Sequence, residues 1–101
     1  MTEKKDLEKN LKEKTEKYFS LTEKALNKIE LKKDLSEKNQ KTAADFLSMA
    51  KNYFSDAKHF SEKKDLLNAL AALSYAHAWL DAGVRAGIFD GKEDDALFTL
   101  R

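Results

Sequence analysis

The chain has 101 residues, which is enough for one domain with one hydrophobic core. It contains no Pro, no Cys and only three Gly, so it offers little turn chemistry for β-hairpins, no disulfide frame and no thiolate for catalysis or zinc binding. The formal net charge is +1, and residues 1–41 mix 12 of the 19 basic with 9 of the 18 acidic side chains. This composition predicts a small all-α protein and argues against nucleic acid as a partner, because nucleic-acid binders carry a stronger basic excess on one face.

The first ten residues are charged and contain no apolar core of the kind a secretory signal needs. The most apolar stretch, residues 66–89, is interrupted by His77, Asp81 and Arg85, so it is too polar to cross a membrane. We therefore expect a cytoplasmic protein with no membrane span.

The first predicted helix covers about residues 3–32. Its apolar stripe is narrow and is expected to rest on the other helices along one seam, with its first two turns overhanging them. The seam consists of Leu7, Leu11, Tyr18, Ala25 and Ile29, flanked by Leu21, Thr22 and Leu26.

The second predicted helix covers residues 37–62, and its start is the hardest boundary to place because no Gly or Pro marks it. Asp34 or Ser36 suits the N-cap, and we favour Ser36, although Thr42 to Asp45 forms a competing capping box. A short connector at residues 61–64 then leads to Asp65 as the next N-cap, which makes the second and third helices antiparallel neighbours.

The third predicted helix covers residues 66–87, with Gly87 at its C′ position. It is apolar on two adjoining faces, so we expect it to be the central helix, buried by two neighbours. One face consists of Leu66, Ala69, Leu73, Ala76, Leu80, Val84 and Gly87, and the other of Ala72, Tyr75, Trp79, Ala82 and Ala86. Trp79 is expected to be a core anchor.

Three segments of residues 44–100 form a recognisable pattern: YFSDAKHF (53–60), ALAALSYAHAWLDAGVRAGIF (69–89) and LFTL (97–100). With these segments the chain resembles an archaeal family called domain of unknown function 357. The resemblance implies an archaeal protein of about this length, built as a left-handed, up-and-down antiparallel bundle of three helices. We expect residues 1–89 to form this bundle. The family has no assigned activity, so the resemblance supplies no functional residues.

A polar stripe on the third helix is the one grouping that looks catalytic. It consists of Ser74, His77, Asp81 and Arg85, in which the carboxylate can orient the imidazole and pair with the guanidinium. A metal site would need a third or fourth ligand, and only one other His, His59, exists in the chain. We interpret the stripe as an intrahelical polar edge, predict no catalytic residue, cofactor or metal, and expect His77 to be dispensable for folding and to bind no zinc.

The last segment, residues 90–101, combines an acidic linker with an apolar tail. The tail carries Leu97, Phe98 and Leu100. Ordering a dozen residues costs roughly 1 to 2 kcal/mol each, which exceeds the gain of about 1.5 to 3 kcal/mol per side chain from burying Phe98 and one Leu. We therefore expect the tail to be loosely held in a monomer, or to be ordered by another chain.

These patterns favour an interaction module without catalytic activity, which binds another protein or itself, because bundles without site chemistry mostly present helix faces to partners. The alternative is an adapter or weak hydrolase for RNA or a nucleotide, using His77, Asp81 and Arg85. An enzyme would need His77 in a pocket beside a second polar cluster, whereas an interaction module needs an exposed apolar patch.

Overall fold

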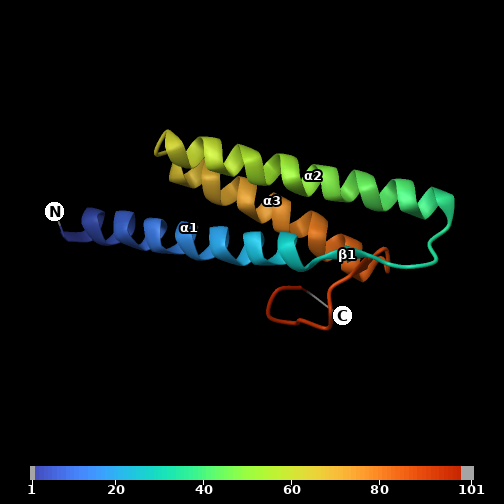
Figure 1. The fold of residues 1–101 in the computed structure, drawn as a ribbon. Helices are drawn as coiled ribbons and strands as arrows, with labels where there is room; N and C mark the ends of the chain where they lie inside the picture. The colour runs from blue at the N-terminus through green and yellow to red at the C-terminus, as the bar shows by residue number, and fades with distance from the viewer. Residues whose placement is uncertain (1, 99–101) are drawn as a thin grey trace.

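The computed structural model describes residues 2–98, and only the backbone of Thr2. Within these residues, three helices and two very short strands follow one another (Figure 1). They are α1 (Thr2–Lys28), β1 (Glu30–Leu31), α2 (Glu37–Glu62), α3 (Leu66–Arg85) and β2 (Phe89–Asp90). The all-α, three-helix expectation is confirmed.

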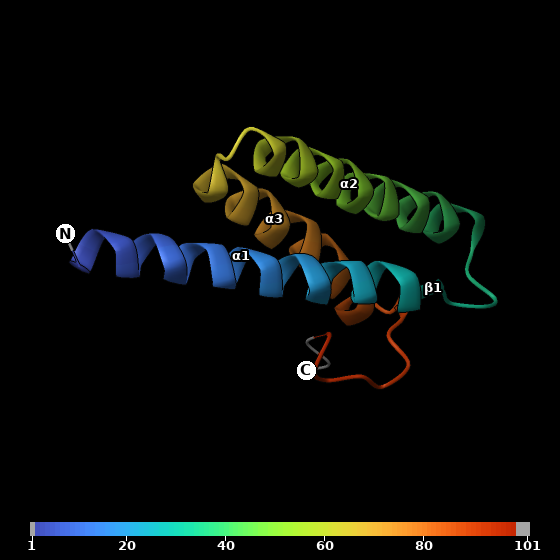
Figure 2. The same ribbon diagram turned by 60° about the vertical axis from the view of Figure 1, so that its left-hand side comes forward.

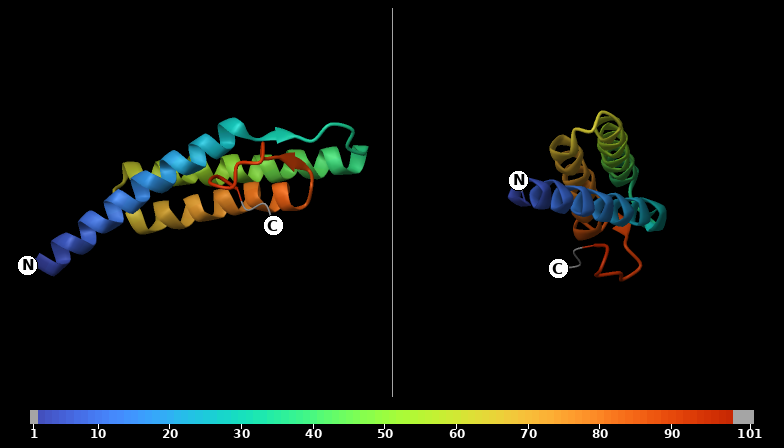
Figure 3. Two further views of the ribbon diagram at one scale, coloured as in Figure 1. Left: turned by 90° about the horizontal axis from the view of Figure 1, so that it is seen from below. Right: turned by 90° about the vertical axis from the view of Figure 1, so that its left-hand side faces the viewer.

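The helices run up, down and up, with α3 in contact with both of the others (Figures 1 and 2). The helices α2 and α3 form a closely packed antiparallel hairpin, whereas α1 lies mainly on α3 and touches α2 much less. Figure 3 shows that α1 crosses the hairpin and that its N-terminal end extends past it. Residues 3–10 are exposed accordingly, so the expected overhang of the first turns is present.

The helix ends are set by local hydrogen bonds that the sequence indicates. Ser36 is the N-cap of α2, and its hydroxyl accepts a hydrogen bond from the Asn39 amide at 3.1 Å. Asp65 is the N-cap of α3 and accepts from the Asn68 amide at 3.3 Å. Gly87 follows the C-cap of α3 with φ at +78°, a conformation that costs glycine little. These three assignments are confirmed.

The first helix ends four residues earlier than expected. We predicted a helix to residue 32, but α1 ends at Lys28 and the next residues pair as β1 with β2, Glu30 opposite Asp90 and Leu31 opposite Phe89. The Lys32 amide also donates to the Ile88 carbonyl at 3.0 Å. Because Gly87 turns the chain back along α1, this pairing satisfies backbone groups that another helical turn would have used.

The seam of α1 is rotated from the predicted one. Ala25 and Ile29 are buried as expected, but Leu7 is 69% and Tyr18 38% exposed, while Thr15 and Thr22 are buried. The Thr15 hydroxyl donates to the Leu11 carbonyl of its own helix at 2.6 Å, which offsets the cost of burying it. Threonine at these positions is small enough to let α1 approach α3 closely.

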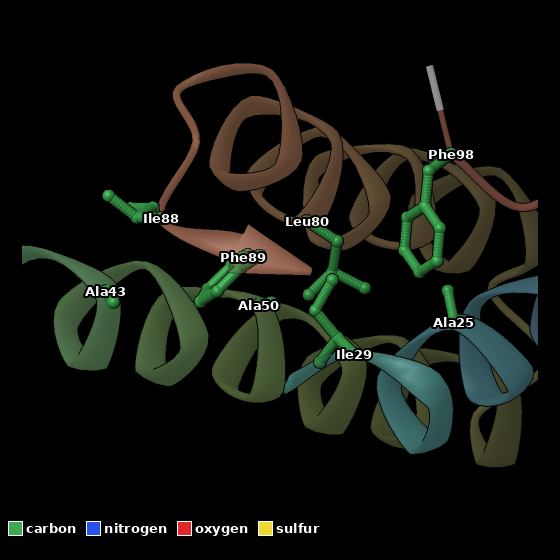
Figure 4. Close-up of a cluster of buried hydrophobic side chains, with 8 residues drawn as sticks. All are labelled: Ala25, Ile29, Ala43, Ala50, Leu80, Ile88, Phe89 and Phe98. Carbon is green, nitrogen blue, oxygen red and sulfur yellow. The ribbon is translucent and has the colours of Figure 1, made fainter. Parts of the chain in front are cut away.

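The core is rich in alanine and has two parts. One part, drawn in Figure 4, lies where α1, α2, α3 and β2 meet, and Phe98 points toward Ala25 of α1 there. The other lies nearer the turn between α2 and α3 and consists of Phe54, Ala57, Ala72, Leu73 and Ala76.

The segment after β2 is packed on the bundle, so the expectation of a loosely held tail is wrong for residues 91–98. Phe98 is only 3% exposed and belongs to the core. Asp94 organises the turn before it, since its side chain accepts from the Ala96 and Leu97 amides and its carbonyl from the Phe98 amide. The strand pair has already ordered the chain as far as Asp90, and the hydrogen bonds of Asp94 act together with the burial of Phe98 to hold residues 91–98.

Candidate functional site

His77 links three parts of the fold. Its Nδ1 lies 3.2 Å from the hydroxyl of Thr22 in α1, and its Nε2 is hydrogen-bonded to the carbonyl of Leu97 in the tail. A carbonyl can only accept, so Nε2 carries the proton, and in the neutral ring Nδ1 accepts from Thr22. Thr22 is fully buried, and His77 is the partner that satisfies its hydroxyl.

Of the remaining residues of the polar stripe, Asp81 lies beside His77, whereas Ser74 and Arg85 have separate surroundings. Asp81 Oδ1 lies 3.9 Å from His77 Nε2, so the structure brings these two side chains together. Ser74 is exposed and donates to the Leu70 carbonyl of its own helix at 3.0 Å, and Arg85 is exposed in the last turn of α3. That His77 is dispensable for folding stays a prediction, and its two long-range contacts, which sequence spacing does not reveal, indicate a contribution to stability.

Within residues 2–98, there is no group of three or more His, Cys, Asp or Glu side chains that could hold a metal ion. His59 is exposed on α2. That His77 binds no zinc stays a prediction.

Two of the candidate tail residues, Leu97 and Phe98, are held by the protein's own bundle. Leu97 is half-buried and contacts His77 through its carbonyl, Phe98 is buried, and Leu100 lies outside the described residues. Lys28 Nζ donates to Asp94 Oδ2 at 2.8 Å, and this hydrogen bond is the main reason why the pKa of Asp94 is lowered. The tail is therefore tied to α1 as well as to α3.

A second group of charges borders the strand pair. Lys92 Nζ lies 2.7 Å from Glu30 Oε2 and 3.6 Å from Asp90 Oδ2. The hydrogen bond to Glu30 raises the pKa of Lys92, and the hydrogen bond that Asp90 accepts from the Lys92 amide lowers the pKa of Asp90. These groups lie at the surface beside the strand pair.

An exposed apolar surface lies on α3, on the side that neither α1 nor the tail covers. Tyr75 is 60% and Leu67 71% exposed there. The alanines Ala71, Ala78, Ala82 and Ala86 are also exposed. We call these six residues the α3 face. Sequence periodicity predicted that Tyr75, Ala82 and Ala86 would be buried, and this expectation is wrong because α2 covers only one edge of that side.

A shallow hollow of 290 Å³ interrupts the α3 face, lined by Tyr75, Ala78, Trp79 and Ala82. Its two rings are held from behind by α2: Tyr75 stacks on Tyr53 with centroids 5.2 Å apart, and Trp79 meets Phe46 edge to face at 5.0 Å. Trp79 is only half-buried, so it packs against the core from the surface instead of anchoring its centre.

A larger hollow of 420 Å³ lies where α1 diverges from the turn between α2 and α3. Its lining is mixed and includes Lys12, Glu16, Phe19, Lys64 and Leu66. Charged side chains of both signs surround it, so it offers no single chemistry to a ligand.

Within the part of the chain that the structure describes, no helix is both long enough and apolar enough to cross a membrane. No curated protein and no solved structure matches the chain. One family model, described as a protein of unknown function (DUF357), matches residues 17–89. That match spans α2, α3 and the C-terminal part of α1, and the chain belongs to the DUF357 family of proteins of unknown function.

Proposed function

We propose that the protein is an interaction module that binds a partner helix on its α3 face. The observation that supports this best is that Tyr75 and Leu67 are exposed on a helix with very few charged residues. Asp81 and Arg85 are the two charged residues of α3, whereas charged residues make up 37% of the whole sequence. Such an apolar stripe has protruding side chains and a hollow, and it can pack against another helix without desolvating a charged group.

The rigidity of the face supports the same function. Tyr53 and Phe46 of α2 fix the rings of Tyr75 and Trp79 in the free protein, so little side-chain entropy is lost when a partner docks. Tyrosine and tryptophan are also the residues most often found at energetic centres of interfaces. A location in the cytoplasm, where a chain without Cys is at no disadvantage, is part of this proposal.

The hydrolase alternative finds less support, because both ring nitrogens of His77 are engaged within the fold. A general base needs a free nitrogen within reach of its substrate. The contacts of His77 with Thr22 and Leu97 give it a structural role instead.

The test compares two arginine variants as bait in affinity purification from the organism that encodes the chain. Ala78→Arg fills the hollow of the α3 face, and Ala44→Arg adds the same charge at an exposed alanine of α2. We expect a stoichiometric partner protein to be retained by wild type and by Ala44→Arg and lost from Ala78→Arg. Recovery of the same proteins with both variants would contradict the proposal.

A further inference from the structure

We infer that the partner helix on the α3 face is the α3 of a second copy of this chain, packed antiparallel about a two-fold axis. The inference rests on the proposed use of this face. It follows from the positions of the large and small residues along α3, which match when the face is turned upon itself.

The hollow has the form that coiled-coil packing requires. Its lining residues Tyr75, Ala78, Trp79 and Ala82 stand at i, i+3, i+4 and i+7, the four positions that make a hole for one knob of a facing helix. Tyr75 itself projects beside the hole as an exposed knob. One face thus carries both halves of a knob-and-hole contact, which is what a two-fold interface needs.

A two-fold axis that passes between Tyr75 and Ala78 satisfies the whole face at once. It sets Tyr75 of each copy opposite Ala78 of the other. The same axis sets Ala71 opposite Ala82 and Leu67 opposite Ala86, so the second exposed large side chain also meets an exposed alanine. Every large residue of the face is then opposite a small one, and no two large side chains compete for the same space.

Charge is compatible with this pairing. In the same register Arg85 lies opposite Asn68, and Asp81 is on the side of α3 that faces His77. No like charges are brought together along the seam, whereas the charged surfaces of α1 would place Lys against Lys or Glu against Glu in many registers. The face therefore lacks the repulsive elements that would prevent self-association.

The strength of association follows from the size of the seam. A helix of 20 residues is about 30 Å long and about 10 Å wide. The contact area that one such helix offers is therefore small beside the roughly 800 Å² that each partner buries in a stable complex. We therefore expect a weak dimer with a dissociation constant of roughly micromolar order.

The first measurement is sedimentation equilibrium of the full chain from low micromolar to millimolar concentration. Wild type and Ala44→Arg should pass from monomer to dimer as the concentration rises. The dissociation constant of Ala78→Arg should be at least tenfold higher than that of wild type. Circular dichroism confirms that each variant keeps its helical fold, which is expected because both alanines are exposed. A monomer at all concentrations would overturn the inference.

The second measurement tests the orientation, using the absence of native Cys. In the antiparallel register Ala71→Cys of one copy lies opposite Ala82→Cys of the other, close enough for a disulfide. We expect a mixture of the two variants to form mixed disulfide dimers and neither variant alone to form many. Disulfide formation by each variant with itself would show a parallel pair and contradict the proposed axis.

Failure of this inference and failure of the proposed function give different results. A monomeric protein that still retains a partner in an Ala78-dependent way refutes the second copy and leaves the interaction role standing. A monomeric protein with no such partner refutes both.

Discussion

Gly83 is the residue that lets the returning chain reach the core. A Cβ built at this position would lie 2.1 Å from Cδ2 and 2.4 Å from Cε2 of Phe89. Phe89 is among the most buried side chains of the protein, so its ring has nowhere to move. A methyl group at position 83 would therefore force Phe89, and with it the strand β2, to move away from α3.

We therefore expect Gly83→Ala to destabilise the fold by about 1–3 kcal/mol or more, although alanine is the better helix former. Gly87→Ala is the comparison: nothing lies within 4 Å of its added Cβ, and its cost is the roughly 1–2 kcal/mol of a left-handed backbone. Urea denaturation of both variants gives the two free energies. A Gly83→Ala protein as stable as wild type would show that Phe89 is not packed as described.

His77 provides a second prediction at this scale. His77→Ala removes the partner of the buried Thr22 hydroxyl and of the Leu97 carbonyl, and an unsatisfied buried group costs about 1–3 kcal/mol. Ser74→Ala, which removes an exposed hydroxyl from the same helix, should stay within about 0.5 kcal/mol of wild type.

Adding Thr22→Val to His77→Ala should recover part of this loss, because the double variant no longer buries the orphaned hydroxyl of Thr22. Chemical denaturation of the single and double variants checks this coupling. Additive losses would show that the contact between His77 and Thr22 carries no energy of its own.

The turn between α2 and α3 contains an unfavourable residue in an otherwise well-capped hairpin. Lys64 follows the C-cap Lys63 with φ at +61°, and its amide donates to the Ser61 carbonyl at 3.0 Å. This is the C′ position at which glycine is usually found. The chain thus carries backbone strain at the tip of its most closely packed helix pair.

Lys64→Gly should raise the free energy of unfolding by about 1 kcal/mol, because glycine adopts this conformation without steric cost. Lys63→Gly is the matched control, since Lys63 has φ at −85° and glycine there adds only flexibility to the unfolded chain. The midpoints of urea denaturation separate the two. A Lys64→Gly protein that is less stable than wild type would contradict this reading of the turn.

Sequence reasoning placed α2 and α3 well and misjudged the end of α1. The caps Ser36 and Asp65 act within three residues of themselves, so their signal is contained in the local sequence. The pairing of Glu30 with Asp90 joins residues far apart in the chain, and no local pattern reports it. For the same reason the structural role of His77, which depends on Thr22 and Leu97, could not be predicted from its own helix.

The exposed α3 face shows a different limit. Periodicity reports which sides of a helix are apolar, and it correctly found two on α3. It does not report how many neighbours the chain supplies to cover them. Only the position of α2 against Tyr75 and Trp79 shows that α3 has more apolar surface than its neighbouring helices bury.

On the scale of the whole molecule, the tail joins α1 to α3 through a contact that depends on pH. Lys28 lowers the pKa of Asp94 in the folded state, so this contact contributes stability above the ordinary carboxyl pKa of about 3.9. The contribution is lost as the pH falls through the lowered value and Asp94 is protonated.

We expect Asp94→Asn to lower the thermal midpoint slightly at pH 6 and to lose less than wild type between pH 6 and pH 3. Asp95→Asn, a change at the exposed neighbour, should follow the wild-type profile. Thermal unfolding of the three proteins across this range provides the comparison. Parallel profiles for Asp94→Asn and wild type would show that the contact with Lys28 has no effect on stability.

The strand pair also bears on the order in which the chain can acquire its structure. The α2–α3 hairpin closes through a short turn and can form as soon as its own residues are available, whereas β1 finds its partner only at Phe89 and Asp90. Domains begin to fold from the N-terminal side during synthesis, yet here the first helix to leave the ribosome is the last to be fixed. Until residues 89–98 arrive, α1 lacks its backbone pairing, its contact with Phe98 and its link through Asp94. A ribosome-bound chain that ends before β2 should therefore hold a formed hairpin with an undocked first helix.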